Sequence, residues 1–203
     1  MRKGLLFIIS GPSGAGKGTI YNEVLKRRPS LKKSVSVTTR QPRAGEVDGV
    51  HYHFRTVDEY RKMIADGGFL ETASVYENYY GTPAAPVLKM LDNGDDVMFE
   101  IDILGARQIK SRYPDSVSVY IMAPSMQILE KRLRERGTES AQSLSRRLGS
   151  ALSELKQYKL FDYIVFNDDV KTSADKVLSI IDAEKCKIGV NEDKIQQILK
   201  ENS

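Results

Sequence analysis

Residues 11–19, with the sequence GPSGAGKGT, constrain the fold of this chain more than any other stretch. They follow the apolar run LLFIIS and contain four glycines and a lysine. Glycine loses more conformational freedom on folding than any other residue, so such a cluster indicates unusual backbone angles or the close approach of a ligand. The apolar run predicts a buried strand, and Ile20 and Val24 recur at helical spacing between about residues 17 and 28. We therefore expect a strand, a glycine loop and a helix in direct succession.

The same residues satisfy the motif G-x-x-x-x-G-K of a loop that binds phosphate groups. In such a loop the backbone N–H groups point at phosphate oxygens, the following helix contributes its dipole, and the lysine reaches the outer phosphates. The dinucleotide-binding pattern G-x-G-x-x-G would need a glycine where Thr19 stands. A glycine-rich turn without a ligand is the alternative, which the flanking strand and helix disfavour. The candidate residues for binding ATP in this loop are Gly11, Pro12, Ser13, Gly14, Ala15, Gly16, Lys17, Gly18 and Thr19.

Position 18 departs from the usual form of this motif. A serine or threonine usually follows the lysine, and its hydroxyl binds magnesium, but this chain has Gly18 there and Thr19 one residue later. We expect Mg²⁺ to arrive with ATP and to be held mainly by nucleotide oxygens and water, with Thr19 as a weak ligand. The form Gly-Lys-Gly-Thr is that of adenylate kinases, which indicates phosphorylation of a nucleotide without identifying the acceptor.

Strands and helices alternate along the rest of the chain. Apolar or β-branched runs predict extended segments, and capped or periodic stretches predict helices. Alternation of this kind favours one globular unit with a largely parallel sheet that helices cover on both faces. The expected extended segments are 34–40, 50–54, 69–81, 96–102, 116–124 and 161–167, and the expected helices are 56–68, 82–94, 125–158 with a break near GTES, 169–184 and a final peripheral helix.

Charge and composition narrow the class of partner. The net charge of +4 and the pI of about 9.0 allow a polyanionic partner, but the basic residues stand in separate groups without interleaved aromatics, which favours a small anionic ligand over nucleic acid. No apolar run approaches the roughly 18 residues of a membrane helix, and GLLFII is too short for a signal-peptide core. The single cysteine, Cys186, suits a reducing cytosol. We therefore expect a cytoplasmic protein without a membrane partner.

Five further segments resemble, in order and spacing, the motifs of the guanylate kinase family, most closely its free-standing bacterial members. They are SVSVTTRQPRAGEVDGVHYHF, GGFLETASVYENYYGT, FEIDILGA, RERGTE and FNDD. The resemblance extends from about residue 5 to residue 181. It implies transfer of the terminal phosphoryl group of ATP to GMP, and it leaves a homo-oligomer open. The implied fold is the three-layer α/β P-loop fold, with a parallel core at about 1–33, 83–125 and 159–190, an inserted GMP-binding region at 34–82, a helical lid at 126–158 and a peripheral C-terminal helix at 191–203.

By this resemblance the GMP site has two parts. Arg40 and Arg43, three residues apart around Pro42, would bind the phosphate dianion together with two tyrosine hydroxyls, since arginine pairs bidentately with such oxygen arrays. Glu71 would accept hydrogen bonds from N1–H and the exocyclic amine of guanine, whereas adenine has an acceptor in place of N1–H. Solvated loop arginines, core tyrosines and a water-facing Glu71 are the alternatives. The full set is Ser36, Arg40, Arg43, Tyr52, Glu71, Tyr80, Thr82, Glu100 and Asp102.

Two of these positions and one neighbour depart from the family's usual residues. The family often has serine at position 82 and aspartate at position 100, and it usually has glutamine where this chain has Leu104. Asp102 ends an apolar strand, where an acid near the magnesium and the phosphates would sit in a P-loop fold.

The remaining candidates lie in the lid and in the loop near residue 167. Arg136 and Arg147 match the lid arginines that close over the ATP phosphates, so the expected catalytic residues are Lys17, Arg40, Arg136 and Arg147. We interpret Arg132, Arg134 and Arg146 as solvated surface. Asn167 and Asp168 resemble the loop that lines the adenine pocket, and a turn that caps the next helix is the alternative. His51 and His53 share a face but lack a third metal ligand.

Overall fold

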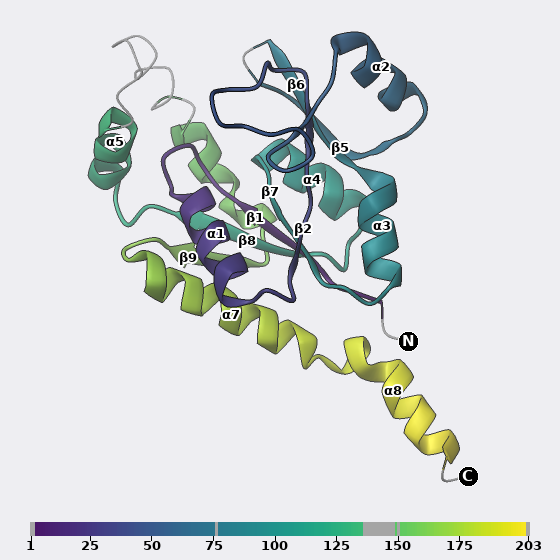
Figure 1. The fold of residues 1–203 in the computed structure, drawn as a ribbon. Helices are drawn as coiled ribbons and strands as arrows, with labels where there is room; N and C mark the ends of the chain where they lie inside the picture. The colour runs from purple at the N-terminus through teal and green to yellow at the C-terminus, as the bar shows by residue number, and fades with distance from the viewer. Residues whose placement is uncertain (1–2, 76, 136–148, 150, 202–203) are drawn as a thin grey trace.

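The computed structural model describes residues 3–75, 77–135, 149 and 151–201 (Figure 1). Its centre is a five-stranded sheet in the order β2-β7-β1-β8-β9, and all of its pairings are parallel. The predicted parallel core is therefore confirmed. The strands are β1 (Leu6–Ser10), β2 (Lys32–Lys33), β7 (Val97–Glu100), β8 (Val117–Met122) and β9 (Tyr163–Phe166).

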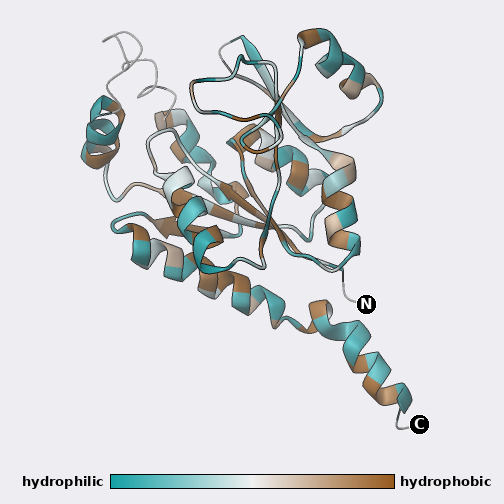
Figure 2. Ribbon diagram, in the orientation of Figure 1, coloured by the Kyte–Doolittle hydropathy of each residue, from teal (hydrophilic) through white to brown (hydrophobic). Residues whose placement is uncertain are grey.

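Helices cover both faces of this sheet. On one face, α1 (Lys17–Arg27) and α7 (Val170–Lys185) pack with Phe7 and Ile9 of β1. On the other face, α3 (Ala84–Asp92) and α4 (Ile103–Arg112) pack in a second cluster that contains the alternate residues of β1. Because β1 is buried on both faces, its sequence is a continuous apolar run, which Figure 2 shows as hydrophobic colour along the central strands.

A second, four-stranded sheet lies beside the first one, at the top of Figure 1. Its order is β4-β3-β6-β5, and the long hairpin of β5 and β6 forms one edge. The helix α2 (Val57–Ala65) begins at Thr56, whose hydroxyl accepts from Glu59 N while the Glu59 carboxylate accepts from Thr56 N. The strands are β3 (Val37–Thr38), β4 (His53–Phe54), β5 (Phe69–Val75) and β6 (Asn78–Pro83).

The helices differ from the sequence-based expectations in two places. The pattern predicts no helix directly after β7, yet α4 begins there, because Asp102 Oδ1 accepts from Gly105 N at 2.7 Å and so caps it. The long helix expected over 125–158 begins as α5 (Met126–Glu135), and the chain is again helical at 151–155 and in the 3₁₀ helix η1 (Lys156–Leu160). The expected break near GTES lies outside the described residues.

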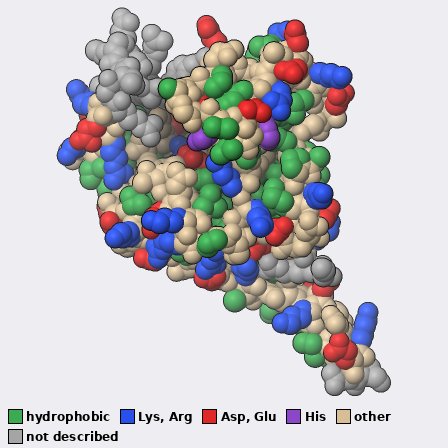
Figure 3. Space-filling view, in the orientation of Figure 1, with side chains coloured by type: hydrophobic (Ala, Val, Ile, Leu, Met, Phe, Trp, Pro, Cys, Tyr) green, Lys and Arg blue, Asp and Glu red, His purple; other side chains and the backbone are tan. Residues whose placement is uncertain are grey.

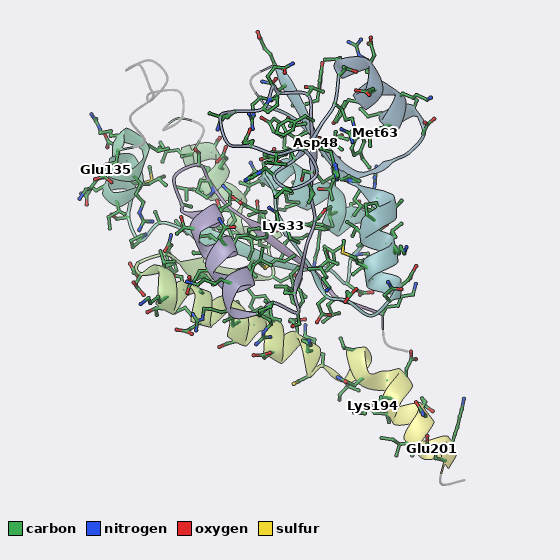
Figure 4. All side chains as sticks on the ribbon, in the orientation of Figure 1. Lys33, Asp48, Met63, Glu135, Lys194 and Glu201 are labelled. Carbon is green, nitrogen blue, oxygen red and sulfur yellow. The ribbon has the colours of Figure 1, made fainter. Side chains whose placement is uncertain are left out.

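The C-terminal helix α8 (Ile188–Glu201) has no buried residue and extends away from the rest of the molecule. Lys194 and Glu201 mark its course in Figure 4. Within the described ranges, no helix is both long and apolar enough to cross a membrane.

Candidate active site

The loop between β1 and α1 has backbone angles that require glycine. Gly11, Gly14 and Gly16 have φ values of 143°, 85° and 88°, a region that residues with a Cβ rarely adopt. Space is also limited, since a Cβ at Gly11 would lie 2.1 Å from Ile121 O and one at Gly16 would lie 2.2 Å from Asn167 Nδ2. The glycines of the motif are therefore determined by the conformation and packing of the loop.

The charged side chains of Lys17 and Glu154 form hydrogen bonds with the backbone of this loop. Lys17 Nζ donates to Gly11 O at 2.6 Å and to Pro12 O at 3.1 Å, so the ammonium group lies over the loop. Ser13 N donates to Glu154 Oε2 at 3.3 Å. A carboxylate thus lies at a backbone N–H of the segment that the motif predicts to bind phosphate.

Asn167 and Arg132 form the wall of the loop next to α5. Asn167 is 3% exposed, and its Nδ2 donates to Ala15 O at 2.8 Å. Arg132 Nη2 donates to Asn167 O at 2.9 Å. Asn167 Oδ1 and Arg132 Nη1 are buried without a hydrogen-bond partner in the described part of the chain, which is uncommon for polar atoms and leaves both able to bind a water, an ion or a ligand.

The interpretation of Arg132 as solvated surface is therefore wrong. Helical spacing alone places it on a charged helix, and only the packing of α5 against Asn167 brings its guanidinium to the loop. Arg134, by contrast, is exposed and pairs with Glu130, as expected for a solvated residue. Asp168 is exposed, and the neighbouring Asp169 caps α7 by accepting from Thr172 N.

Glu100 lies at the carboxyl end of β7, beside the first turn of α1. A Cβ at Gly18 would lie 3.2 Å from Glu100 Oε2, so the carboxylate lies against the position where this motif usually has a hydroxyl side chain. Thr19 is exposed close by. Both belong to an open pocket of about 540 Å³ that is lined by Gly18, Thr19, Asn22, Glu23, Lys26, Glu100 and Val170.

Arg40, Tyr52 and Tyr80 form a cluster on the second sheet. The Arg40 guanidinium carbon lies 5.6 Å from the centre of the Tyr52 ring, and the rings of Tyr52 and Tyr80 are 6.0 Å apart. Arg40 Nη2 donates to Glu46 at 2.9 Å and 3.0 Å, and Arg43 N donates to the same carboxylate at 2.7 Å. Chiefly because of Arg40, the pKa of Glu46 falls to about 2.

Glu46 belongs to this cluster and is absent from the residues expected from the sequence. It ends the motif Thr-Thr-Arg-x-Pro-Arg-x-Gly-Glu, and this position was the signal that could have identified it. The side chain of Arg43 is exposed at the rim of the cluster.

The two parts of the site approach each other at Glu100. Glu100 pairs with Ile9 of β1, directly before the glycine loop. Burial raises the pKa of Tyr52, and electrostatic interactions with Tyr80 and Glu100 raise it further. In Figure 4, Asp48, in the loop before β4, and Glu135, at the end of α5, lie on opposite sides of the glycine loop.

Glu71, on β5, is a buried carboxylate with 4% of its surface exposed. Thr82 Oγ1 donates to Glu71 Oε1 at 2.7 Å. Burial raises the pKa of Glu71 to about 7, the Thr82 hydrogen bond opposes the rise, and the charge of Asp102 adds to it. The alternative of a water-facing edge residue is therefore wrong, and Glu71 lies with Thr82 and Asp102 in one polar cluster.

The other residues considered from the sequence have fewer contacts with these two clusters. Ser36 is partly buried just before β3, where its carbonyl accepts from His53 N at 2.8 Å. Leu104 is 59% exposed on the first turn of α4. His51 accepts from Val47 N, and no group of three or more His, Cys, Asp or Glu that could hold a metal was found among the residues that the structure describes. Arg136, Arg147 and Arg146 lie outside the described residues.

The chain is similar to known proteins over almost its whole length. A sequence model described as guanylate kinase matches residues 3–184. The guanylate kinase of Caldanaerobacter subterraneus subsp. tengcongensis is 48% identical over 201 residues, which are 99% of this chain and 98% of that protein. The guanylate kinase of Carboxydothermus hydrogenoformans is 50% identical over 187 residues, 92% of each chain.

The crystal structure of the guanylate kinase from Anaplasma phagocytophilum has a similar fold. Its TM-score is 0.76 at 32% sequence identity, and the similarity covers 92% of this chain and 88% of that one. This agreement confirms the predicted α/β fold of the P-loop type. Because the family match and the relatives cover almost the whole sequence, the chain belongs to the guanylate kinase family.

Proposed function

We propose that the chain transfers the terminal phosphoryl group of ATP to GMP, giving ADP and GDP, with ATP on the glycine loop and GMP on the second sheet. As a member of the guanylate kinase family it is a nucleoside monophosphate kinase. The observation that carries the assignment of the two sites is the end of β7. There Glu100 pairs with Ile9, just before the glycine loop, and its carboxylate lies against Gly18. Two residues later Asp102 caps the helix whose Gly105 lies against Glu71. Two anion-binding sites on either side of the end of β7 suit the transfer of a phosphoryl group from one nucleotide to another.

On the ATP side, the backbone N–H groups of residues 11–19 would bind the phosphates, and Lys17 would move from the loop carbonyls to their oxygens. Asn167 and Asp168 are proposed to line the adenine pocket. Arg132 joins this set because its buried Nη1 lacks a partner among the described residues. Arg136 and Arg147 are kept as lid residues on the resemblance alone.

On the GMP side, the phosphate would bind to Arg40, Arg43, Tyr52 and Tyr80. The Glu46 carboxylate supports this, because it lies where an anion contacts Arg40 in two hydrogen bonds. Both of these hydrogen bonds come from the single nitrogen Nη2. A phosphate dianion can likewise accept from a guanidinium, in a bidentate contact that uses two of its nitrogens. Glu46 would then still orient Arg40. It could accept from another nitrogen of the guanidinium, or it could act through the hydrogen bond that it accepts from Arg43 N.

Guanine would be selected by Glu71 in its ionised form, with Ser36, Thr82 and Asp102 around the base. A carboxylate accepts two parallel hydrogen bonds from N1–H and the exocyclic amine. Sites built on such paired polar contacts reject a base without them by roughly 10⁴-fold or more. Glu100, whose described contacts are with α1, is proposed to border both nucleotides.

The reaction needs positioning and charge neutralisation more than proton transfer. The attacking phosphate oxygen of GMP is already ionised at neutral pH, so no general base is required. Lys17 and the arginines would stabilise the charge on the transferred group, and a lid would exclude water.

Magnesium fits the residues that are present. Glu100 Oε2 lies against the empty Cβ position of Gly18, and Thr19 adds a hydroxyl in the same pocket, so the donors are oxygens, as Mg²⁺ requires. Glu100 and Thr19 would hold the ion together with the nucleotide phosphates and water. When bound, Mg²⁺ neutralises charge on the phosphates.

A nucleotide panel tests the proposed function. The chain is mixed with ATP, Mg²⁺ and one of GMP, AMP, UMP or CMP, and ADP release and the nucleotide products are measured. We expect GDP from GMP and little product from the others. Equal turnover of AMP or UMP contradicts the role of Glu71, and no turnover of any nucleotide favours an interaction module that binds a phosphorylated ligand.

We also propose a cytoplasmic location and small anionic substrates as the partners of the chain. Cys186 is an exposed free thiol, which suits a reducing cytoplasm. Figure 3 shows Lys and Arg side chains in separate groups with acidic ones between them, a distribution that suits small anionic substrates better than nucleic acid. Assembly into a homo-oligomer remains a prediction that no observation tests.

A further inference from the structure

The first turn of α4 lies so close to Glu71 that a side chain at position 105 would displace the Glu71 carboxylate. Gly105 is the third residue of α4, and a Cβ there would lie 2.7 Å from Glu71 Oε2 and 3.2 Å from Glu71 Cδ. Real Cβ atoms essentially never approach another atom within 3.0 Å. The carboxylate of Glu71 therefore occupies the volume that any other side chain at position 105 would need.

The backbone of α4 does not itself explain this glycine. Gly105 is absent from the glycines with positive φ, and in a helix interior glycine is a poorer residue than any except proline. Its Cα hydrogen faces a buried carboxylate instead of solvent. The reason for glycine at this position is the close packing of Glu71.

Four hydrogen bonds hold α4 in place along β5. Gln108 Nε2 donates to Thr72 O at 2.7 Å, and Gln108 Oε1 accepts from Thr72 N at 3.1 Å. Arg112 Nη1 donates to Phe69 O and to Leu70 O at 2.9 Å each. These contacts lie on both sides of Glu71 along β5 and hold α4 against the strand. An added Cβ at position 105 would therefore displace the Glu71 carboxylate and leave α4 in place.

The other oxygen of Glu71 is located from the opposite side. Thr82 Oγ1 donates to Oε1 at 2.7 Å, and Asp102 is held as the α4 cap by Gly105 N at 2.7 Å. The plane of the Glu71 carboxylate is therefore fixed by the Thr82 hydroxyl at Oε1 and by the Cα of Gly105, which carries no side chain, at Oε2.

We propose that Gly105 is a positioning residue for purine selection, which keeps the Glu71 carboxylate in the plane where it accepts both N–H groups of guanine. The inference rests on the proposed function, in which Glu71 binds the base. A methyl group at position 105 would push Oε2 aside and remove one of the two hydrogen bonds.

The test is the variant Gly105→Ala, with Gly189→Ala as its matched control, because Gly189 lies in α8 and a Cβ there meets nothing within 4 Å. We expect Gly105→Ala to raise the Kd of GMP roughly 10- to 100-fold, the cost of one hydrogen bond to a charged acceptor. The preference for GMP over IMP, which lacks the exocyclic amine, should shrink. The Kd of ATP should not change, and the Tm should stay within about 4 °C.

A positioning role also predicts rescue by a shorter side chain. In the background of Glu71→Asp the carboxylate is withdrawn, so adding Gly105→Ala should cost much less GMP affinity than it costs in the natural sequence. If Gly105→Ala alone cannot be purified, the double variant decides: recovered folding supports the steric contact, and failure to recover it overturns the proposal.

Two results overturn the inference and spare the proposed function. One is an unchanged Kd of GMP in Gly105→Ala, and the other is a parallel loss of GMP affinity, ATP affinity and Tm, which indicates a purely structural glycine. Glu71→Gln separates the two levels. If it leaves the GMP Kd unchanged, the proposed role of Glu71 itself fails.

Discussion

If Glu71 binds guanine as proposed, GMP binding should depend on pH near neutrality. Its pKa is raised to about 7, mainly by burial, while Asp102 adds to the rise and Thr82 opposes it. Only the ionised carboxylate accepts both N–H groups of guanine, so the observed Kd equals the intrinsic Kd divided by the ionised fraction. That fraction falls from about nine tenths at pH 8 to about one tenth at pH 6, and the Kd of GMP should therefore rise about 10-fold between these values.

The variant Glu71→Gln isolates this effect. The phosphate of GMP also titrates, with a second pKa of about 6, but it contributes equally to both proteins. Isothermal titration of GMP into each protein at pH 6, 7 and 8 gives the ratio of the two Kd values. We expect this ratio to change about 10-fold, with the natural protein gaining relative affinity as the pH rises. A ratio that is independent of pH would refute the reasoning.

The same shift predicts an effect on stability. A carboxyl group whose pKa rises from 4.5 to about 7 on folding binds its proton more tightly in the folded state. Stability is therefore lost as the pH rises from about 4.5 to about 7, and keeping the group ionised above that range costs up to about 3 kcal/mol. At pH 8, Glu71→Gln should raise the free energy of unfolding by up to this amount, and the gain should vanish near pH 4.5. Urea unfolding at both pH values measures it.

Three further predictions concern the loop, its wall and the second sheet. Lys17→Ala should lower kcat at least about 100-fold and leave the Kd of GMP unchanged, and a normal kcat with ATP and GMP contradicts the role of the lysine. Arg132→Ala should raise the KM of ATP about 10-fold, the cost of one charged hydrogen bond, and leave the KM of GMP unchanged, whereas the exposed Arg134→Ala should change neither; equal effects of the two variants would return Arg132 to the solvated surface. Thr56→Ala should lower the free energy of unfolding by about 1 kcal/mol because it removes the cap of α2, while Thr56→Ser should retain it, as thermal unfolding would show.

Local patterns predicted much of the fold. The apolar run before Gly11 predicted a buried strand because β1 is covered on both faces, and the Thr56 cap predicted α2 because capping depends on residues within one turn. The α4 helix was missed. Its start depends on Asp102, which also ends a strand pattern, and its helical face is interrupted by Gly105.

The sequence by itself determined the glycine loop and the family, and it supplied the residues that are proposed for both anion sites. These depend on short motifs, which can be recognised from the order and spacing of residues along the chain. Only the tertiary structure decided what those residues contact. It placed Arg132 against Asn167, Glu46 on Arg40 and Glu71 on the first turn of α4. Each of these contacts joins segments whose distance in space is set by the packing of helices on two sheets, and burial, which raises the pKa of Glu71, exists only once that packing has formed.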